Sequence, residues 1–389
     1  MNHLVERPPA APPGRKRRRL YRVALAGIAT VLALFVLEIG TRIYVRATGG
    51  QLGRYTFRNE AGQDKIYRPH PYTAYNLAPG AIRRQSGIEM RINSLGYRGP
   101  EFPLEKPPGE TRVVCVGGST TFGTSVEEPD SWPRRLEGLL RSQLRDRPIS
   151  VINAGVPGFT TAETLVNVAL RVMDVSPDVL VILENVNDLA PRLWPHFASD
   201  YSHYRKPMTS PSQGFVDRAL EKVSSFYALV RYKLTDYQWS HSVEYHTTVD
   251  FLDNRNRSEV DLDERTLRPF RDHLVMLCRL ARGYEIRPVL CTMARRQDPG
   301  EASPSFVRAF DQQNEAIREI AASEKVALVD LDRELSGRDE LFVDMVHTNV
   351  KGSAAVAKLV ASGLSEKDVL ASPATADATS GAAGAGVHH

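Results

Sequence analysis

The sequence predicts an α/β protein: a three-layer α/β/α domain with a five-stranded parallel sheet, preceded by an N-terminal transmembrane helix. Two observations predict this fold class. Short apolar runs rich in β-branched residues alternate with stretches of helical periodicity from residue 112 onward, and an uncharged apolar segment follows a basic cluster near residue 20. Strands that alternate with helices in this way form a parallel sheet covered by helices on both faces.

Each expected strand is a short apolar run bounded by polar or turn-forming residues. The five runs are residues 112–116, 149–152, 178–183, 287–293 and 326–330. Helical periodicity marks the segments between most of them, which are residues 132–144, 163–173, 267–282 and 305–322. We find no internal repeat.

Residues 20–40 form the expected membrane anchor. These 21 residues span about 31 Å as a helix, which matches the roughly 30 Å hydrocarbon core of a bilayer. Residues 15–19 are all basic, and such a positive flank stays on the cytoplasmic side. A cleaved signal peptide is the alternative, but residues 37–42 offer no clear small-x-small cleavage site. We therefore expect a single-pass protein of the inner membrane whose folded domain is periplasmic.

Composition suggests the remaining boundaries. Residues 1–19 form a basic cytoplasmic tail, and residues 41–110, rich in Pro, Gly, Tyr and Arg, form a juxtamembrane lead-in of irregular and short β structure. Residues 111–365 form the α/β domain, in which residues 189–262 are a long aromatic-rich insertion. Residues 366–389 are mostly Ala, Gly, Ser and Thr, so we expect them to be disordered.

The charge distribution argues against a nucleic-acid partner. The formal net charge is +4, but residues 1–22 alone carry +6, which leaves −2 for the rest of the chain. A nucleic-acid-binding protein is expected to carry its positive charge on the folded domain. The three cysteines do not indicate a disulfide framework, because Cys115 and Cys291 lie in apolar runs that are typical of buried thiols.

A serine follows the first expected strand at a glycine-rich turn, in the order Gly117-Gly118-Ser119-Thr120. In an open parallel sheet, reactive groups gather at the carboxyl ends of the strands. The glycines permit a tight turn, and the helix start beyond them can present backbone N–H groups to an anion. Taken alone, the segment fits a nucleophile, an N-capping loop or a phosphate-binding loop, although it lacks the Lys-Ser/Thr of a P-loop.

Three further strand ends carry candidate site residues. Gly155 follows the second strand, Asn187 follows the third, and Asp344 and His347 follow the fifth after a short linker. An aspartate and a histidine three residues apart approach each other on one turn, so Asp344 can hold His347 at Nδ1 and leave Nε2 for a serine. A lone histidine is often only a surface or core residue, but four strand-end signals in this chain order indicate a site.

This ordered set, Ser119, Gly155, Asn187 and Asp344-x-x-His347, resembles the SGNH (GDSL-like) hydrolase superfamily over residues 110–365. Residues 66–101 are also similar to the lead-in of membrane-anchored bacterial members. The resemblance implies a flavodoxin-like fold and a serine esterase that needs no cofactor and no metal. It implies that Ser119 is the nucleophile, His347 the base and Asp344 its orienting partner. The implied oxyanion hole consists of the Ser119 and Gly155 backbone N–H groups and the Asn187 side-chain amide.

The sequence departs from the family pattern at two places. The first block has Gly118 where the family name implies Asp, but that acid is not part of the triad. The third block has Asn185 where glycine is common, and we expect this residue to narrow the floor of the site.

The insertion, residues 189–262, holds 12 of the 30 aromatic residues of the chain. A structureless segment of that length is uncommon in a compact domain, and residues 217–234 have helical periodicity. Flat aromatic faces suit sugar rings or acyl chains, which favours a lid or substrate platform. A satellite core that packs its own aromatic residues is an equal alternative. The histidines of this region match no compact zinc pattern; they are His196, His203, His241 and His246.

Together these observations predict a membrane-anchored serine esterase that removes O-acyl groups, acetyl in particular, from an extracytoplasmic glycan. Its partners would be the acylated glycan, or another ester, and the membrane. One alternative is an O-acyltransferase that passes the acyl group from the same acyl-enzyme to a sugar hydroxyl. Another is a non-catalytic, glycan-binding scaffold of the cell envelope, although such a scaffold has no physical need of all five site residues.

Overall fold

The computed structural model describes residues 15–47, 51–52, 55–56, 66–70, 72–85, 87–193, 197–204, 216, 219–220, 223–230, 263–298, 302–367 and 369–370. The chain divides into two compact units. We call Met1–Asn59 with Pro211–Gln238 the anchor unit, and Glu60–Ser210 with Trp239–His389 the α/β unit. Each is described by itself.

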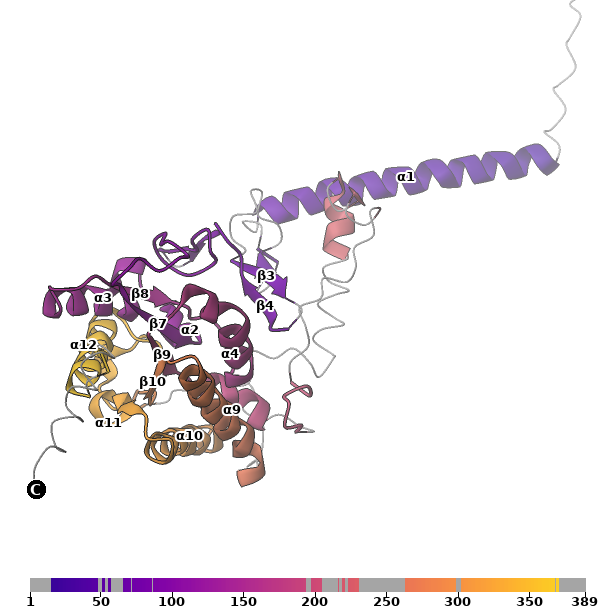
Figure 1. The fold of residues 1–389 in the computed structure, drawn as a ribbon. Coiled ribbons are helices and arrows are strands. Elements are labelled where there is room, and N and C mark those ends of the chain that lie inside the picture. Colours follow the sequence, from indigo (N-terminus) through magenta and orange to yellow (C-terminus); the bar gives the residue numbers. More distant parts are fainter. Residues whose placement is uncertain are drawn as a thin grey trace, which may run out of the picture. The chain divides into compact units, whose positions relative to one another are not determined.

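The anchor unit contains one long apolar helix, α1 (Arg15–Ala47) (Figure 1). Of the described helices, α1 alone is long and apolar enough to cross a membrane, over Arg17–Tyr44, and its most apolar part is not buried in the protein. A membrane anchor and a signal sequence both have these properties. Two short strands, β1 (Gln51–Leu52) and β2 (Tyr55–Thr56), pair antiparallel after it.

A second segment of the anchor unit is bound to α1 through Glu38. The Glu38 carboxylate accepts hydrogen bonds from Ser224 Oγ and from the backbone N–H groups of the next two residues, at 2.9–3.0 Å. Residues 225–230 are helical, so Glu38 caps the start of that helical segment. Arg42 donates to Glu38 at 2.7 Å and to the Val223 carbonyl at 3.1 Å.

The α/β unit is built on a five-stranded sheet in which all strands run parallel (Figure 1). This sheet confirms the predicted fold class, and its strand order is the flavodoxin-like one. The order reverses between the central pair, β7 and β9, which is where open α/β sheets place their ligand sites. In spatial order the strands are β8 (Ile149–Asn153), β7 (Thr111–Gly117), β9 (Val179–Leu183), β10 (Arg287–Cys291) and β11 (Ala327–Val329).

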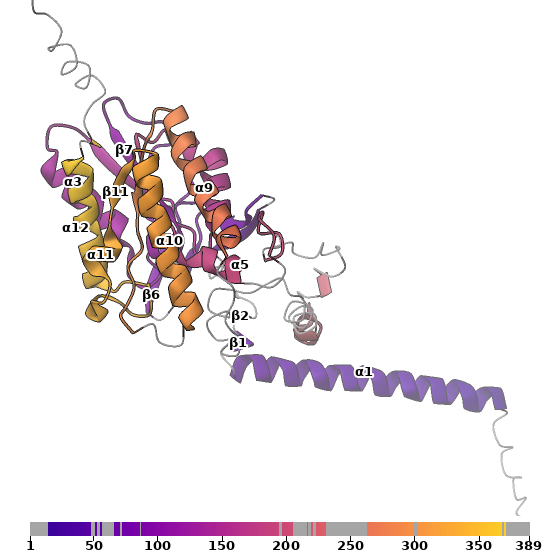
Figure 2. The same ribbon diagram turned by 90° about the horizontal axis from the view of Figure 1, so that it is seen from below.

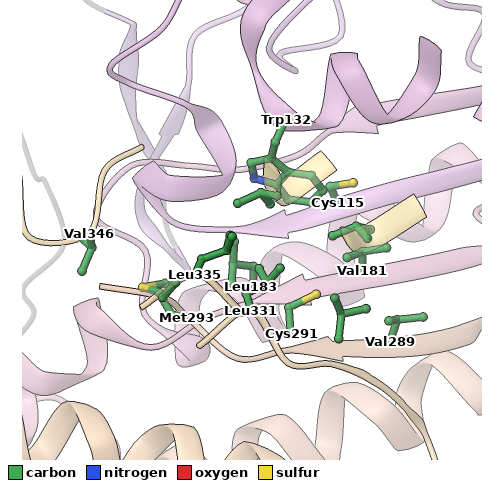
Figure 3. Packing of buried hydrophobic residues seen from close by; sticks show 14 of the residues in the cluster. Cys115, Trp132, Val181, Leu183, Val289, Cys291, Met293, Leu331, Leu335 and Val346 are labelled. Atoms are coloured by element: carbon green, nitrogen blue, oxygen red, sulfur yellow. The ribbon is translucent and has the colours of Figure 1, made fainter. Parts of the chain in front are cut away.

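The centre of the sheet is buried on both faces, which explains why its strands are continuous apolar runs. On β7, Val113 and Cys115 face one hydrophobic core, whereas Val114 and Val116 face the other. Val114 pairs with Ile152 on β8 and with Leu180 on β9. Side chains from β7, β9 and β10 belong to the first core, in which Trp132 lies beside Cys115 of β7 (Figure 3).

Helices cover both faces of the sheet (Figure 2). The first face carries α3 (Trp132–Gln143) and α12 (Val350–Glu366), which pack against each other. The second carries α4 (Thr161–Asn167) and α9 (Glu264–Gly283), and α10 (Pro304–Ser323) contributes to both cores. The shorter helices are α2 (Ser119–Phe122), α5 (Leu189–Leu193) and α11 (Leu331–Leu335), with 3₁₀ turns at Glu128–Asp130, Met173–Val175, Val186–Asp188 and Asp339–Leu341.

Two helices differ from the sequence prediction. The segment expected as one helix over residues 163–173 consists of α4, a π-helical turn (Val168–Val172) and a 3₁₀ turn. Arg171 in this turn donates to the carbonyls of Leu95 and Gly96, which joins the turn to the lead-in. The second is α12, which the sequence did not indicate, because its small residues give a weak apolar pattern. Gly363 lets it pack closely on β11, because a Cβ there would lie 2.6 Å from Val329 Cγ2.

The first part of the lead-in, up to Asn59, belongs to the anchor unit, and from residue 66 onward the lead-in belongs to the α/β unit, where it forms two antiparallel hairpins. They are β3 (Tyr67–His70) with β4 (Ala74–Leu77), and β5 (Ile82–Gln85) with β6 (Ile88–Arg91). Its apolar side chains form a third small core with Phe122, Val156 and Phe159, which follow strands β7 and β8. The lead-in therefore supports the loops at the carboxyl end of the sheet.

The three cysteines are buried and free, as expected for Cys115 and Cys291. Burial raises the pKa of Cys278 and of Cys291 to about 12, so both thiols stay protonated at neutral pH.

Several sequence predictions fall largely outside the described residues. These are the basic tail, the aromatic insertion as a lid or platform, and the C-terminal tail beyond residue 370. Three of the four histidines of the insertion, His196, His241 and His246, also lie outside the described residues. Of the insertion's aromatic residues, Tyr201 and Tyr204 are described and buried.

Candidate active site

The predicted site residues gather at the carboxyl end of the sheet. Ser119 begins α2 directly after β7, Gly155 follows β8, and Asn187 lies in the 3₁₀ turn after β9. Asp344 and His347 lie in the loop between the last 3₁₀ turn and α12. The strand ends β7 and β9 are neighbours, so the serine and the asparagine lie side by side at the reversal of strand order.

Ser119, His347 and Asp344 form a continuous hydrogen-bonded chain. His347 Nε2 lies 2.7 Å from Ser119 Oγ, and His347 Nδ1 lies 2.7 Å from Asp344 Oδ2. With the Nδ1 proton donated to the carboxylate, Nε2 is left as the acceptor for the serine hydroxyl proton. This is the arrangement in which a histidine acts as the general base for a serine nucleophile.

The loop that carries His347 is held in place by hydrogen bonds between its own backbone and side-chain groups. Asp344 Oδ1 accepts hydrogen bonds from the backbone N–H groups of Val346 and His347 at 3.0 and 2.8 Å. The His347 carbonyl accepts from the Val343 N–H at 2.9 Å. Asn349 closes the loop, because its Oδ1 caps the N-terminus of α12 and its Nδ2 donates to the Glu340 carbonyl.

The Asp344 carboxyl is set to remain ionised. Its partial removal from water raises the pKa, but the hydrogen bonds from His347 and the charge of that ring outweigh this effect, and the pKa of Asp344 lies below its ordinary value. An ionised Asp344 accepts the Nδ1 proton of His347, which is the contact by which a carboxylate can fix the tautomer of a histidine ring.

Two glycines before the serine bring the ends of β7 and β9 together. A Cβ at Gly117, whose φ is +150°, would lie 2.2 Å from the Leu183 carbonyl oxygen. A Cβ at Gly118 would lie 2.3 Å from Asn187 Nδ2. In this structure the Asn187 amide therefore occupies the space that a side chain at residue 118 would need.

The backbone N–H groups near Ser119 differ in their hydrogen bonding. Ser119 is the first residue of α2, so its N–H has no acceptor within that helix. The Gly155 N–H donates to Asn153 Oδ1 at 3.1 Å. Gly155 also packs directly on α2, since a Cβ there would lie 2.4 Å from the Phe122 nitrogen. In this structure Gly155 therefore allows the loop after β8 to pack closely on α2, and its N–H already has an acceptor in Asn153 Oδ1.

Asn187 is held in place from both sides. Its Nδ2 donates to the Phe159 carbonyl at 2.7 Å. The next residue, Asp188, is fully buried and accepts hydrogen bonds from Thr161 N–H, Thr161 Oγ1 and the Tyr201 hydroxyl at 2.6–3.0 Å. Asp188 was assigned no role from the sequence, because it lies at the end of the 3₁₀ turn beyond β9 and its partners Thr161 and Tyr201 come from other segments.

Asn185 does not act as the sequence suggested. Its side chain is completely buried, and Nδ2 donates to the Phe310 carbonyl at 3.2 Å and to Asn314 Oδ1 at 2.9 Å. Both partners lie on α10, so Asn185 joins the end of β9 to that helix. The expected narrowing of the site floor is replaced by a contact inside the protein.

No metal site accompanies these residues in the part of the chain that the structure describes: no three His, Cys, Asp or Glu side chains there are placed to hold an ion.

Comparison with known proteins identifies the family. The model of the GDSL-like Lipase/Acylhydrolase family matches residues 115–355, and the chain belongs to this family of serine ester hydrolases. No curated protein matches the sequence.

Solved structures of this fold resemble the chain at low sequence identity. A putative lipolytic protein of the G-D-S-L family from Desulfitobacterium hafniense DCB-2 is 15% identical, with a TM-score of 0.39, over 65% of this chain and 99% of that one. A lipase/acylhydrolase from Enterococcus faecalis is 17% identical, with a TM-score of 0.41, over 66% and 96%. The acetylxylan esterase Axe2 from Geobacillus stearothermophilus is 16% identical, with a TM-score of 0.39, over 65% and 94%.

The burial of Asp188 predicts a specific pH dependence of stability. Burial raises the pKa of Asp188 from 3.8 to about 7, against the hydrogen bonds from Thr161 and Tyr201, which favour the ionised form. The folded protein therefore binds this proton more tightly than the unfolded chain, and the stability gained is complete below about pH 4 and lost as the pH rises to about 7. Asp188→Asn removes this titrating carboxyl. As the pH rises from about 4 to about 7, the free energy of unfolding of the wild type should therefore fall relative to that of Asp188→Asn, by about 4 kcal/mol at most.

Urea unfolding at pH 4, 5.5 and 7 measures this difference, with the exposed Asp174→Asn as control. A difference between wild type and Asp188→Asn that stays constant with pH would contradict the prediction.

Proposed function

We propose that the protein is a membrane-anchored serine esterase that works by a Ser119-His347-Asp344 mechanism and removes O-acyl groups, acetyl in particular, from an extracytoplasmic glycan. The observation that carries the mechanism is the 2.7 Å distance between Ser119 Oγ and His347 Nε2, together with the equal distance from His347 Nδ1 to Asp344. Residues 111–365 act as the catalytic domain in this proposal.

The reaction proceeds in two acyl-transfer steps. His347 Nε2 takes the hydroxyl proton as Ser119 Oγ attacks the ester carbonyl, and the resulting tetrahedral intermediate carries one negative oxygen. The intermediate collapses with cleavage of the carbon–oxygen ester bond, and His347 gives its proton to the departing alcohol. Water then attacks the acyl-Ser119 ester, with His347 again as base, and releases the carboxylic acid and the free serine.

The negative oxygen needs preorganised hydrogen-bond donors. We assign this role to the Ser119 N–H at the start of α2 and to the Asn187 Nδ2 amide, which lies against the residue that precedes the serine. The Gly155 N–H already donates to Asn153 Oδ1. It becomes the third donor of the oxyanion hole only when the oxyanion shares this N–H with Asn153 Oδ1 or takes its place.

Membrane attachment is supported by the contacts of α1 inside the anchor unit. Removal of α1 as a signal peptide would leave the segment 223–230 without the Glu38 carboxylate that caps it and without Arg42. An uncleaved helix keeps both contacts, and the basic residues before it favour an orientation with the α/β unit outside the cytoplasm.

The anchor can be tested with epitope tags at the two ends of the chain. We expect one species that carries both tags, stays with the membrane fraction after an alkaline wash, and loses only its C-terminal tag to protease added outside the cytoplasmic membrane. A soluble, shorter species with the C-terminal tag alone would show that α1 is a cleaved signal sequence.

The nucleophile can be tested by covalent labelling. A fluorophosphonate probe should label the wild-type protein once, and Ser119→Ala should abolish the labelling and lower kcat on a short ester by about 10⁴–10⁶-fold, because the attacking hydroxyl is gone. Ser131→Ala serves as the matched control, since this serine is the N-cap residue that precedes α3 and its hydroxyl donates to the Glu128 carbonyl at 2.8 Å. Wild-type esterase activity in folded Ser119→Ala would end the assignment.

The substrate class can be tested with esters of graded acyl length. The acetyl proposal predicts that kcat/KM on p-nitrophenyl acetate exceeds that on long-chain esters, and that acetate is released from O-acetylated polysaccharide. Product analysis with an added acceptor glycan separates hydrolysis from acyl transfer. Activity confined to long acyl chains would refute the acetyl-glycan substrate while leaving the serine mechanism intact.

A further inference from the structure

Arg98 of the lead-in holds the helix that begins with Ser119. It lies outside the residues that the family model matches, and its side chain is buried, with 3% of the residue exposed. Nη1 donates to the carbonyl oxygens of Phe122 and Gly123, and Nη2 donates to that of Val126 at 2.6 Å. The guanidinium also stacks over the Phe122 ring, 4.6 Å from its centroid. One side chain thus binds three carbonyls at the end of α2.

A helix as short as α2 needs such support. It has four residues, which is too few for a helix to be stable by itself, and its last carbonyl groups have no partner within it. A cation at a helix C-terminus is also favourable electrostatically. The helix ends at Gly123, whose φ is +80° and where a Cβ would lie 3.1 Å from Arg98 Nη1, so glycine and arginine fit each other at this turn.

The same contacts reach the loop after β8. Asn153 Nδ2 donates to the Phe122 carbonyl at 3.2 Å, and Asn153 Oδ1 accepts the Gly155 N–H. The Arg98 backbone N–H donates to the Asn153 carbonyl at 3.2 Å. Arg98 therefore lies at the point where the loops that carry Ser119 and Gly155 join.

We infer that Arg98 is a positioning residue for the esterase reaction: by binding the carbonyls of Phe122, Gly123 and Val126 it fixes α2 and keeps Ser119 Oγ on the line to His347 Nε2. The inference rests on the proposed serine mechanism and adds a residue to it. A planar guanidinium suits the task better than lysine, because its fork of N–H groups reaches several carbonyls at fixed angles. Burial lowers the pKa of Arg98 to about 10, so the group stays charged at neutral pH.

The lead-in offers a matched control for a merely structural role. Arg171 also binds the lead-in, donating to the carbonyls of Leu95 and Gly96 and stacking 4.2 Å from the Tyr97 ring centroid. Like Arg98 it binds backbone carbonyls and an aromatic face, but the carbonyls that it binds lie in the lead-in and not on α2. Loss of either side chain should lower stability, whereas only loss of Arg98 should affect the chemistry.

The experiment compares Arg98→Met, Arg98→Lys and Arg171→Met in the full-length, detergent-solubilised protein. We expect Arg98→Met to lower kcat on a short ester about 100-fold, with KM within a factor of about two, because a displacement of about 1 Å at a reacting group can cost that much. Arg98→Lys keeps the charge without the fork and should lose about tenfold. Arg171→Met should keep kcat within a factor of about two, even where its Tm falls as far as that of Arg98→Met.

Wild-type kcat in folded Arg98→Met would overturn the inference, as would an equal loss of kcat in Arg171→Met. If Arg98→Met does not fold, Arg98→Lys decides, since a wild-type kcat there overturns the inference and a tenfold loss supports it.

A spectroscopic measurement separates this inference from the proposed function. In protein with ¹⁵N-labelled histidine, the low-field proton that His347 Nδ1 shares with Asp344 should shift in Arg98→Met and stay unchanged in Arg171→Met. If the wild type is not labelled by the fluorophosphonate probe, the proposed serine mechanism fails. The resonance of the His347 Nδ1 proton still decides in that case whether Arg98 positions the Ser119–His347 pair. An unchanged resonance in Arg98→Met would reject the positioning role even in an active enzyme.

Discussion

The candidate site depends on the close approach of two glycines to the end of the neighbouring strand. Gly117 and Gly118 lie so near the Leu183 carbonyl and the Asn187 amide that a Cβ at either position would overlap with them. The Leu183 carbonyl belongs to the backbone of β9, which is paired with β7, and the Asn187 amide is held by its hydrogen bond to Phe159, so neither can move aside without breaking a contact. This contact sets the serine beside the asparagine and aims the start of α2 into the space between the two loops.

Beneath this contact, buried acids fix the end of β9. Glu184 accepts a hydrogen bond from the Thr164 hydroxyl, and Asp188 accepts from Thr161 one helical turn earlier on α4. Burial raises the pKa of both carboxyl groups. Such networks are costly when a partner is missing and rigid when every group is paired. The turn that carries Asn187 is thereby tied to α4 on one face of the sheet, while Asn185 ties it to α10.

The sheet could be predicted from the sequence because parallel strands buried on both faces are continuous β-branched runs, as Val113–Val116 shows. The approach of Asp344 to His347 likewise follows from a spacing of three residues. Contacts between distant segments left no such signal. From the sequence, Asn185 was expected in the site floor, because its hydrogen-bond partner Asn314 lies 129 residues away along the chain and could not be identified. Nothing in the sequence distinguishes Arg98 from the other basic residues of the lead-in. Helix α12 gave only a weak signal because it is stabilised by packing on α3 and not by an apolar pattern of its own.

The distance along the chain between the two ends of the Ser119–His347 hydrogen bond has a consequence for biogenesis. The residues are 228 positions apart, and the loop with the histidine is anchored by the cap of the last helix. Contacts of such high sequence separation form late in folding, because the entropy of closing the chain must be overcome first. A nascent or partly folded polypeptide therefore carries a plain, unactivated alcohol at residue 119. In the proposed mechanism, only a finished sheet with its final helix in place brings the His347 imidazole to this alcohol, so nucleophilic reactivity is withheld until folding is complete.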